Sequence, residues 1–192
     1  MRWNGESCIS ISDIETPRLR LRRWRPENLE PFAALNADPE VMEHFPSVLS
    51  PEETAAGVDR IEKHFETHGF GWWALEVPGQ APFVGFIGLA VPAFEASFTP
   101  CVEIGWRLAR PWWGQGLATE GARAALAYGF ERLGLPEIVS FTVPGNVRSR
   151  RVMEKLGFRY SEDFEHPRIE PGNPLRRHVL YHLSKAEWTA AG

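Results

Sequence analysis

The order of apolar and polar residues in the first third of the chain predicts one strand and two helices. Residues 18–22 alternate with period two, which indicates a half-exposed strand. Apolar residues at helical spacing follow Pro26 and predict a helix that ends near Asp38. Residues 50–53, Ser-Pro-Glu-Glu, form a capping box and predict a second helix to about His68. Because its apolar positions are sparse, we expect that helix to lie on the surface.

The middle of the chain changes character. Three β-rich runs separated by turn residues predict an antiparallel meander; they cover residues 72–77, 82–91 and 101–108. An alanine-rich helix is expected over residues 117–133, and a strand over 138–143. A further helix begins at Asn146, with Gly157 placed as its C′ residue. Residues 158–164 and 177–183 are expected to form a final pair of strands, so the chain as a whole predicts a mixed α/β fold.

Length and composition favour one globular domain. The chain has 192 residues, of which 43% are apolar and 24% charged, and this is enough to bury a core without cross-links. Residues 1–14 are expected to be a polar leader, and residues 15–192 a single domain. The leader lacks the apolar stretch of a signal peptide. Only two cysteines occur, Cys8 and Cys101, which favours a cytoplasmic protein with free thiols.

Charge and hydropathy make two classes of partner unfavourable. The net charge is −4 and the pI is about 5.9, whereas general nucleic-acid binders carry a basic surface. No apolar run approaches the roughly 20 residues of a membrane helix. We therefore expect neither nucleic acid nor membrane as a partner, and the sequence leaves a monomer and a homodimer equally open.

Residues 113–120, Trp-Gly-Gln-Gly-Leu-Ala-Thr-Glu, join an expected strand to an expected helix. A glycine-containing loop in that position lets several backbone N–H groups point at one anion, which the helix dipole also favours. The segment is no Walker loop, because Gly116 is not followed by Lys and Ser or Thr. It also lacks the third glycine of a dinucleotide fingerprint. Either the glycines are purely structural, or the loop holds phosphate in another way.

The segment from Asn146 to Phe158 has an ordinary structural explanation and a functional one. An asparagine cap and an apolar face describe an amphipathic helix. That description leaves unexplained a group of arginines in an acidic protein, namely Arg148, Arg150 and Arg151. They would be useful beside a phosphate-bearing ligand, or they could form a solvated face.

Four segments in order resemble the GNAT acyltransferases, and among them the ribosomal-protein N-terminal (Rim-type) acetyltransferases. They are Thr-Pro-Arg-Leu-Arg-Leu-Arg at 16–22, Glu-Ile-Gly-Trp at 103–106, the loop at 113–120, and Asn-x-x-Ser to Glu-Lys-Leu-Gly-Phe at 146–158. The resemblance implies a mostly antiparallel sheet that splays between its fourth and fifth strands, with helices on both faces. It also implies acetyl-CoA as co-substrate and an amine acceptor. His44, His166 and His178 lack metal-ligand spacing, so we expect no metal.

The resemblance further implies site residues. The pantetheine arm would pair with the backbone of Trp106, Arg107 and Leu108. The diphosphate would lie on the loop Trp113, Gly114, Gln115, Gly116, Leu117, Ala118 and Thr119, with Asn146 and Arg151 also at the coenzyme. The family pattern has Gln or Arg where this chain has Trp113, so backbone amides would carry the phosphate contacts. Glu103 is the candidate base and Ser149 the candidate proton relay to the thiolate. Tyr128 and Tyr160 are rival acids.

Several alternatives stay open. Glu103 could instead form an ion pair with Arg20 or Arg22 on a neighbouring strand. The acceptor could be a protein N-terminus or a small amine, and its pocket is expected between residues 44–50, Trp72-Trp73, residues 92–100 and residues 164–175. A succinyl donor would need cationic groups near the acyl pocket. The protein could also be a catalytically silent acyl-CoA-binding module.

Overall fold

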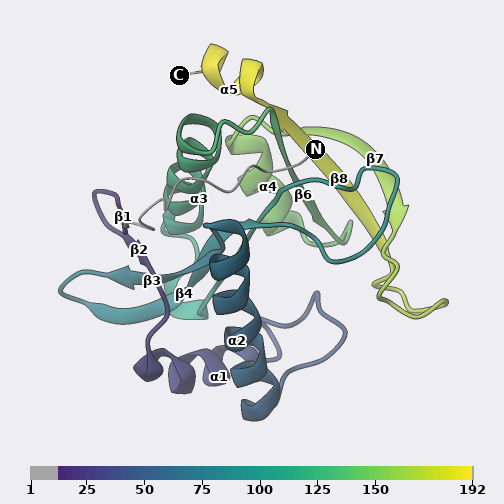
Figure 1. Ribbon diagram of the computed structural model, residues 1–192. Coiled ribbons are helices and arrows are strands. Elements are labelled where there is room, and N and C mark those ends of the chain that lie inside the picture. Colours follow the sequence, from purple (N-terminus) through teal and green to yellow (C-terminus); the bar gives the residue numbers. More distant parts are fainter. Residues whose placement is uncertain (1–12, 192) are drawn as a thin grey trace.

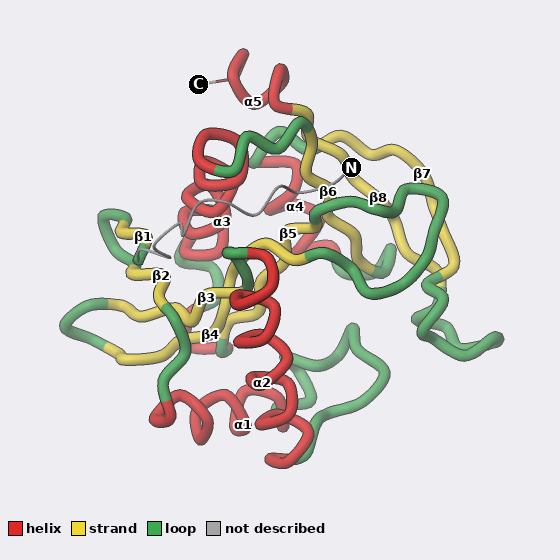
Figure 2. Tube along the Cα trace, viewed as in Figure 1, coloured by secondary structure: helices red, strands yellow, loops and turns green. Residues whose placement is uncertain are grey.

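A computed structural model describes residues 13–191, and its centre is one eight-stranded sheet with the order β1-β2-β3-β4-β5-β6-β8-β7 (Figures 1 and 2). The strands are β1 (Ile14–Glu15), β2 (Arg20–Arg22), β3 (Trp72–Val77), β4 (Ala81–Ala90), β5 (Glu103–Leu108), β6 (Glu137–Thr142), β7 (Arg159–Glu165) and β8 (Arg177–Ser184). All neighbouring strands are antiparallel except β5 and β6, which are parallel.

The helices cover both faces of the sheet. They are α1 (Leu29–Ala37), α2 (Pro51–His68), α3 (Leu117–Ala127), α4 (Val147–Lys155) and α5 (Lys185–Ala191), with short helical turns η1 (Pro26–Asn28), η2 (Arg110–Trp112) and η3 (Tyr128–Arg132). Helix α1 packs on β4 and on α2, whereas α3 packs on the other side against β4 and β5 (Figure 1). Helix α4 lies beside α3 and against β6. The sheet is therefore a middle layer between two helical layers.

The expected fold class is confirmed, and so are most element boundaries. Helix α2 begins with the predicted capping box, in which Ser50 accepts from the Glu53 N–H and the Glu53 side chain accepts from the Ser50 N–H. Gly157 follows α4 with a φ of 90°. The expected helix over 117–133 is α3 followed by the π-helical turn η3. Strand β1 and helix α5 were not predicted.

Most of the expected polar leader, residues 1–12, lies outside the described residues. Over residues 13–191, none of the helices combines the length and the apolar character that crossing a bilayer requires.

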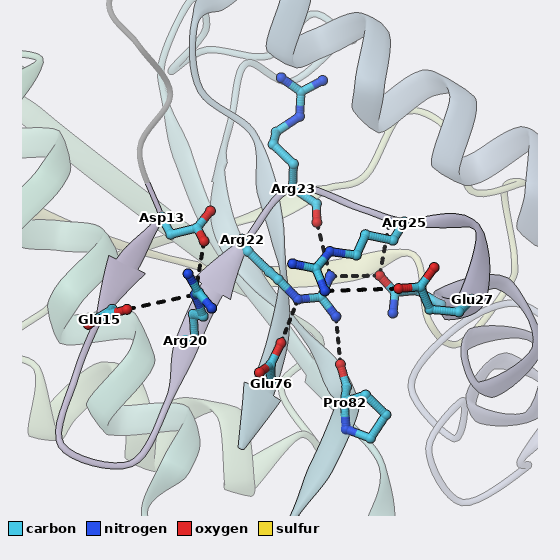
Figure 3. A network of polar contacts seen from close by, with 10 residues as sticks. Asp13, Glu15, Arg20, Arg22, Arg23, Arg25, Glu27, Glu76 and Pro82 are labelled. Carbon is cyan, nitrogen blue, oxygen red and sulfur yellow. Dashed lines mark hydrogen bonds and ion pairs between the residues drawn. The ribbon is translucent and has the colours of Figure 1, made fainter. Parts of the chain in front are cut away.

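The prediction of a half-exposed strand at residues 18–22 is wrong at Arg22. This side chain is only 1% exposed, and it donates from Nε to Glu76 (2.8 Å), from Nη1 to Asn28 (2.9 Å) and from Nη2 to the carbonyl of Pro82 (2.6 Å). Figure 3 shows Arg22 pointing at Glu76 and Pro82, whereas Arg20 points at Asp13. Alternation alone misassigned Arg22 because a buried cation is stable when every donor finds an acceptor.

Candidate active site

The sheet opens between β5 and β6. Within the described residues the two strands are paired at a single position, Glu103 with Val139. Val139 N–H donates to the carbonyl of Val102 (2.9 Å), and the hydroxyl of Ser140 donates to the carbonyl of Ile104 (3.0 Å). No paired position follows Glu103 and Val139 in residues 13–191, so the strands diverge after Ile104. Without the two-residue β1, these are the fourth and fifth strands, where the splay was expected.

The edge of β5 that faces this gap carries free backbone groups. In a strand, alternate residues direct their N–H and C=O groups to the same side, so Trp106 and Leu108 follow Ile104 at the gap. The carbonyl of Leu108 accepts from the indole Nε1 of Trp113 (2.7 Å). Arg107 has the opposite orientation, and its backbone faces Phe86 of β4. Arg107 therefore brings its side chain to the site, while Trp106 and Leu108 bring backbone.

The loop after η2 has the geometry of an anion-binding nest. Gly114 and Gly116 have φ values of 73° and 80°, a left-handed conformation that side chains with a Cβ rarely adopt. Gly116 is the N-cap of α3, and its carbonyl accepts the N–H of Glu120 (3.0 Å). In the described part of the chain, none of the backbone N–H groups of residues 114–119 has a hydrogen-bond acceptor. These six donors and the positive end of the α3 dipole favour a phosphate.

The loop is held in place by the N-terminal motif. Glu120 accepts from the hydroxyl of Thr16 (2.6 Å), from the N–H of Arg18 (2.9 Å) and from Nε of Arg18 (2.6 Å). Arg18 Nη1 donates to the carbonyl of Gln115 (2.8 Å). Burial opposes ionisation of Glu120, but these donors outweigh it and lower its pKa. We call these contacts of Glu120 with Thr16 and Arg18 the brace. The brace was not predicted from the sequence, although Thr16 and Arg18 lie in the first motif and Glu120 lies in the loop motif.

Trp113 connects the start of the loop to β5 and to α4. Besides its hydrogen bond to Leu108, its ring lies 4.6 Å from the guanidinium carbon of Arg148 at the start of α4. The side chain of Gln115 donates to the carbonyl of Pro111 (2.8 Å). Thus the side chains of Trp113 and Gln115 stabilise the loop, and the backbone is left for a ligand.

Glu103 is a carboxylate without a hydrogen-bond donor or a cation within ion-pair distance among the described residues. The alternative ion pair with Arg20 or Arg22 is wrong, because these arginines pair with Asp13 and Glu76. Burial raises the pKa of Glu103 to about 8, although the charge of Arg168 lowers it. The raised pKa places its titration in the range where a general base functions.

Two loops meet near Glu103 and are tied together by aromatic contacts. In the 92–100 segment, Phe94 packs edge-on against Phe141, and Phe98 packs edge-on against Phe164. His166 lies in the same group; burial first, then the charges of His178 and Arg168, lower its pKa to about 4. Arg168 also donates to the carbonyl of Ala93. The structure thus brings together two of the four expected walls.

The other two walls are only partly as expected. Trp72 is half-buried and stacks on Phe86 with ring centroids 5.2 Å apart. Trp73 is 0% exposed and belongs to the core, so its expected place in a pocket wall is wrong. Phe45, from the α1–α2 segment, is 37% exposed and lies over Arg107.

Helix α4 presents Ser149 after a capped start. Asn146 Oδ1 accepts the Ser149 N–H (3.2 Å), and its Nδ2 donates to the hydroxyl of Thr142 (3.0 Å). The side chain of Asn146 is therefore an N-cap with both ends used. The hydroxyl of Ser149 has no partner in residues 13–191, and its side chain is half-buried. It is free to exchange a proton.

The remaining candidates separate clearly. Arg150 donates to the hydroxyl of Tyr181 (3.1 Å) and to the carbonyl of Pro144 (3.1 Å), which is a structural role. Arg151 is exposed. Of the rival acids, Tyr128 is buried in the core at 7% exposure, and Tyr160 is exposed and donates to Asp163 (3.1 Å).

An open groove of about 640 Å³ begins at the nest and follows α3. Its lining includes Gly116 and Thr119 at one end, and Arg123 and Lys155 along its length. Glu15 and Glu120 also line the groove, so it continues the anion-binding loop with two cationic and two acidic side chains. Within residues 13–191, no group of three or more His, Cys, Asp or Glu side chains could hold a metal ion.

Comparison with known proteins agrees with this geometry. The family profile described as "Acetyltransferase (GNAT) domain" matches residues 18–159. An Aspergillus fumigatus protein, FsC-acetyl coenzyme A-N(2)-transacetylase, is 36% identical over 189 residues, which cover 91% of this chain and 77% of that protein. A GNAT-family acetyltransferase structure from Bacillus anthracis has a TM-score of 0.75 at 27% identity, covering 91% of this chain and 99% of the other. A ribosomal-protein alpha-N-acetyltransferase (RimL) in complex with coenzyme A shares the fold, with a TM-score of 0.71, 18% identity, and 90% and 98% of the chains covered.

Proposed function

Because this chain belongs to the GNAT family of acetyltransferases, we propose that it transfers an acetyl group from acetyl-CoA to a primary amine by direct attack in a ternary complex. The observation that carries the proposal is the row of six unpaired N–H groups from Gly114 to Thr119, next to the opened edge of β5. The nest fits the diphosphate of the coenzyme, and the free backbone of Trp106 fits an extended arm that carries amides. The relative from Aspergillus fumigatus is also named for acetyl coenzyme A.

The coenzyme's ribose and 3′-phosphate have a candidate place in the groove along α3. Arg123 and Lys155 border it, and cationic side chains there would complement a phosphate. Arg151, on the exposed side of α4, would add a long-range positive charge. Asn146 would act through the start of α4, since both ends of its side chain are already bonded.

Glu103 is proposed as the base. The acetyl thioester supplies the electrophile, and the acceptor must present a neutral amine. An α-amino group has a pKa of roughly 7.7–8.0, close to the value of about 8 for Glu103, so transfer of its proton to the carboxylate, directly or through water, is nearly isoenergetic. The new C–N bond forms as the C–S bond breaks.

The backbone N–H of Trp106 is proposed to donate to the carbonyl oxygen of the thioester, where negative charge develops during attack. Removing one such donor typically costs on the order of 10²–10³ in rate. Ser149 is proposed to pass a proton to the leaving thiolate. A hydroxyl is a weak acid, so it would act as a relay that takes a proton from water as it gives one.

The test has a binding arm and a turnover arm. Calorimetry with acetyl-CoA should register binding, and a free-thiol assay against a library of small amines and N-terminal peptides should register turnover with at least one acceptor. Binding without turnover against the whole library would assign a silent acyl-CoA-binding module instead. Absence of heat with any acyl-CoA would contradict the whole proposal.

A further inference from the structure

Arg107 is a half-buried arginine on the same face of β5 as Glu103 and Gly105, since side chains alternate along a strand. Its Nη1 donates to Oδ1 of Asn36 (2.6 Å). Its Nε is buried without a hydrogen-bond partner, and Nη2 donates to no acceptor in residues 13–191. No carboxylate of the described chain lies within ion-pair distance of it. Arg107 thus differs from Arg22, in which each of the three guanidinium nitrogens donates to an acceptor.

The guanidinium is fixed in position, so its free donors have a defined direction. Its central carbon lies 4.0 Å from the ring centroid of Phe45 and 5.4 Å from that of Phe86. The segment that carries Phe45 is tied to η2, because Arg110 pairs with Asp38 (3.0 Å) and with Glu40. Asn36 is itself fully buried and donates to Thr54 (3.1 Å). Rotation of Arg107 toward another protein acceptor would break these contacts.

A second unpaired donor lies on the same face. The indole Nε1 of Trp72 is buried without a partner, and a Cβ added to Gly105 would lie 3.8 Å from it. Gly105 follows Glu103 by two residues and precedes Arg107 by two. On this face of the sheet, Nε of Arg107 and Nε1 of Trp72 therefore have no acceptor among the described residues.

A cation that lies largely out of water is costly unless an anion or several acceptors accompany it. Burial accordingly lowers the pKa of Arg107 to about 10. A guanidinium matches a carboxylate, which accepts through two oxygens. The missing partner is therefore expected to arrive with a reactant.

Building on the proposed function, we infer that Arg107 and Trp72 bind a carboxylate group carried by one of the two reactants, and so determine substrate specificity. The carboxylate belongs either to the acceptor, which is then an amino-acid-like amine, or to the acyl group, which is then a dicarboxylic acyl such as succinyl. The chemistry recognised is the same in both cases. The cationic group that a succinyl donor requires is the Arg107 side chain.

The experiment has one arm for each source. In the first, acetyl-CoA is offered with amino acids and with the matching amino-acid amides, which keep the amine and lose the negative charge. In the second, succinyl-CoA and acetyl-CoA are compared with one uncharged amine. We expect a preference of at least about 10-fold in kcat/KM for the carboxylate-bearing member in one arm, the effect of a hydrogen bond to a charged group.

Variants assign that preference to Arg107. Arg107→Gln should reduce it to less than about twofold, and Arg107→Lys should keep part of it, since charge remains without the planar fork. Trp72→Phe should reduce it about threefold to fivefold. Arg20→Gln, which removes one positive charge from β2, is the matched control and should keep the preference. An unchanged thermal shift with acetyl-CoA shows that each variant is folded.

Equal rates in both arms, a preference for the uncharged member, or a preference that survives in Arg107→Gln would overturn the inference. So would acetyl-CoA binding without turnover of either member of any pair. These outcomes differ from failure of the proposed function, which would appear as no binding of acetyl-CoA and no turnover with any amine or peptide.

Discussion

The edge of β5 at the gap and one face of the same strand offer different kinds of group to a ligand. On the gap side, the ligand-facing groups are backbone: the N–H groups of residues 114–119 and of Trp106, held by a brace of side chains. On one face of the strand, the groups are side chains: Glu103 has no hydrogen-bond donor among the described residues, and Arg107 keeps Nε without an acceptor although its Nη1 donates to Asn36. Backbone donors suit the invariant part of a reaction, here the coenzyme, because any sequence that makes the turn supplies them. Unpaired side chains suit the part that differs between enzymes, the acceptor.

The largest effect on turnover should come from a change to the side chains on the face of β5, which we call the side-chain half of the site. Glu103→Gln is expected to lower kcat/KM about 10²–10⁴-fold, the usual contribution of a positioned base, with acetyl-CoA affinity unchanged. Steady-state thiol release and calorimetry measure the two quantities. Normal turnover by this variant would place the base elsewhere, in a chain of water molecules.

A change to the loop of residues 114–119, the backbone half of the site, should instead abolish coenzyme binding. Gly116→Val forces a β-branched residue to a φ of 80° and should abolish binding, so that acetyl-CoA at 100 times the wild-type Kd no longer adds its roughly 2.7 kcal/mol of stability. Gly79→Val is the control, because Gly79 has a φ of 75° in open space in the β3–β4 turn. If both variants keep the thermal shift, the nest does not bind the coenzyme.

The pH dependence of kcat/KM and of acetyl-CoA affinity distinguishes the side-chain half from the backbone half without a mutation. Glu103 accepts a proton only when ionised, so kcat/KM should fall about 10-fold per pH unit below its pKa of about 8. An aromatic amine as acceptor keeps its own titration outside this range. Acetyl-CoA affinity should stay constant from pH 6 to pH 8. In Glu103→Gln the acid limb should disappear; its persistence would mean that another group titrates.

The brace between the N-terminal motif and the loop should have a smaller effect. Glu120→Ala removes the acceptor of Thr16 and Arg18 and should raise the Kd for acetyl-CoA about 10-fold, because hydrogen bonds to a charged group contribute about 1.5–3 kcal/mol. Glu62 of α2 forms a comparable half-exposed ion pair with Arg23. Glu62→Ala removes this pair and should leave that Kd unchanged. An equal effect of both variants would indicate general destabilisation.

The smallest effect compares two indoles. Trp113→Phe loses the bond to Leu108, and Trp24→Phe loses an equivalent 2.7 Å bond to the carbonyl of Trp72. Each should lower the free energy of unfolding by about 1 kcal/mol in chemical denaturation. Only Trp113→Phe should also weaken acetyl-CoA binding, by about threefold. Equal acetyl-CoA affinities in the two variants would show that Trp113 does not support the loop.

The backbone half could be predicted from the sequence, and the side-chain half only in part. Glycine spacing and the helix start at Leu117 are local signals, as is the capping box at Ser50, so the nest was expected where it lies. Glu103 was expected from its place in a strand. The free state of Arg107 depends on Asn36, Phe45 and Phe86, which are distant in sequence, and no local pattern specifies which arginines find partners.

The same limit explains the errors. Arg22 and Arg20 occupy equivalent positions in an alternating pattern, yet Arg22 is buried and Arg20 is not. The side chains of Asn28 and Glu76 accept hydrogen bonds from Arg22, whereas Arg20 pairs with Asp13. Trp72 and Trp73 are adjacent in sequence and face opposite sides of β3, so one is half-buried beside Gly105 and the other is core. Tertiary neighbours decided each case.

The single point of pairing between β5 and β6 makes the folded sheet incomplete on its own. An extended, amide-bearing arm in the gap would act as a removable strand that joins two half-sheets. Binding energy would then also be folding energy, growing as RT ln(1 + [L]/Kd). Resistance of this protein to heat and to proteolysis would therefore follow the supply of coenzyme, and the apoprotein would be the form that is cleared first.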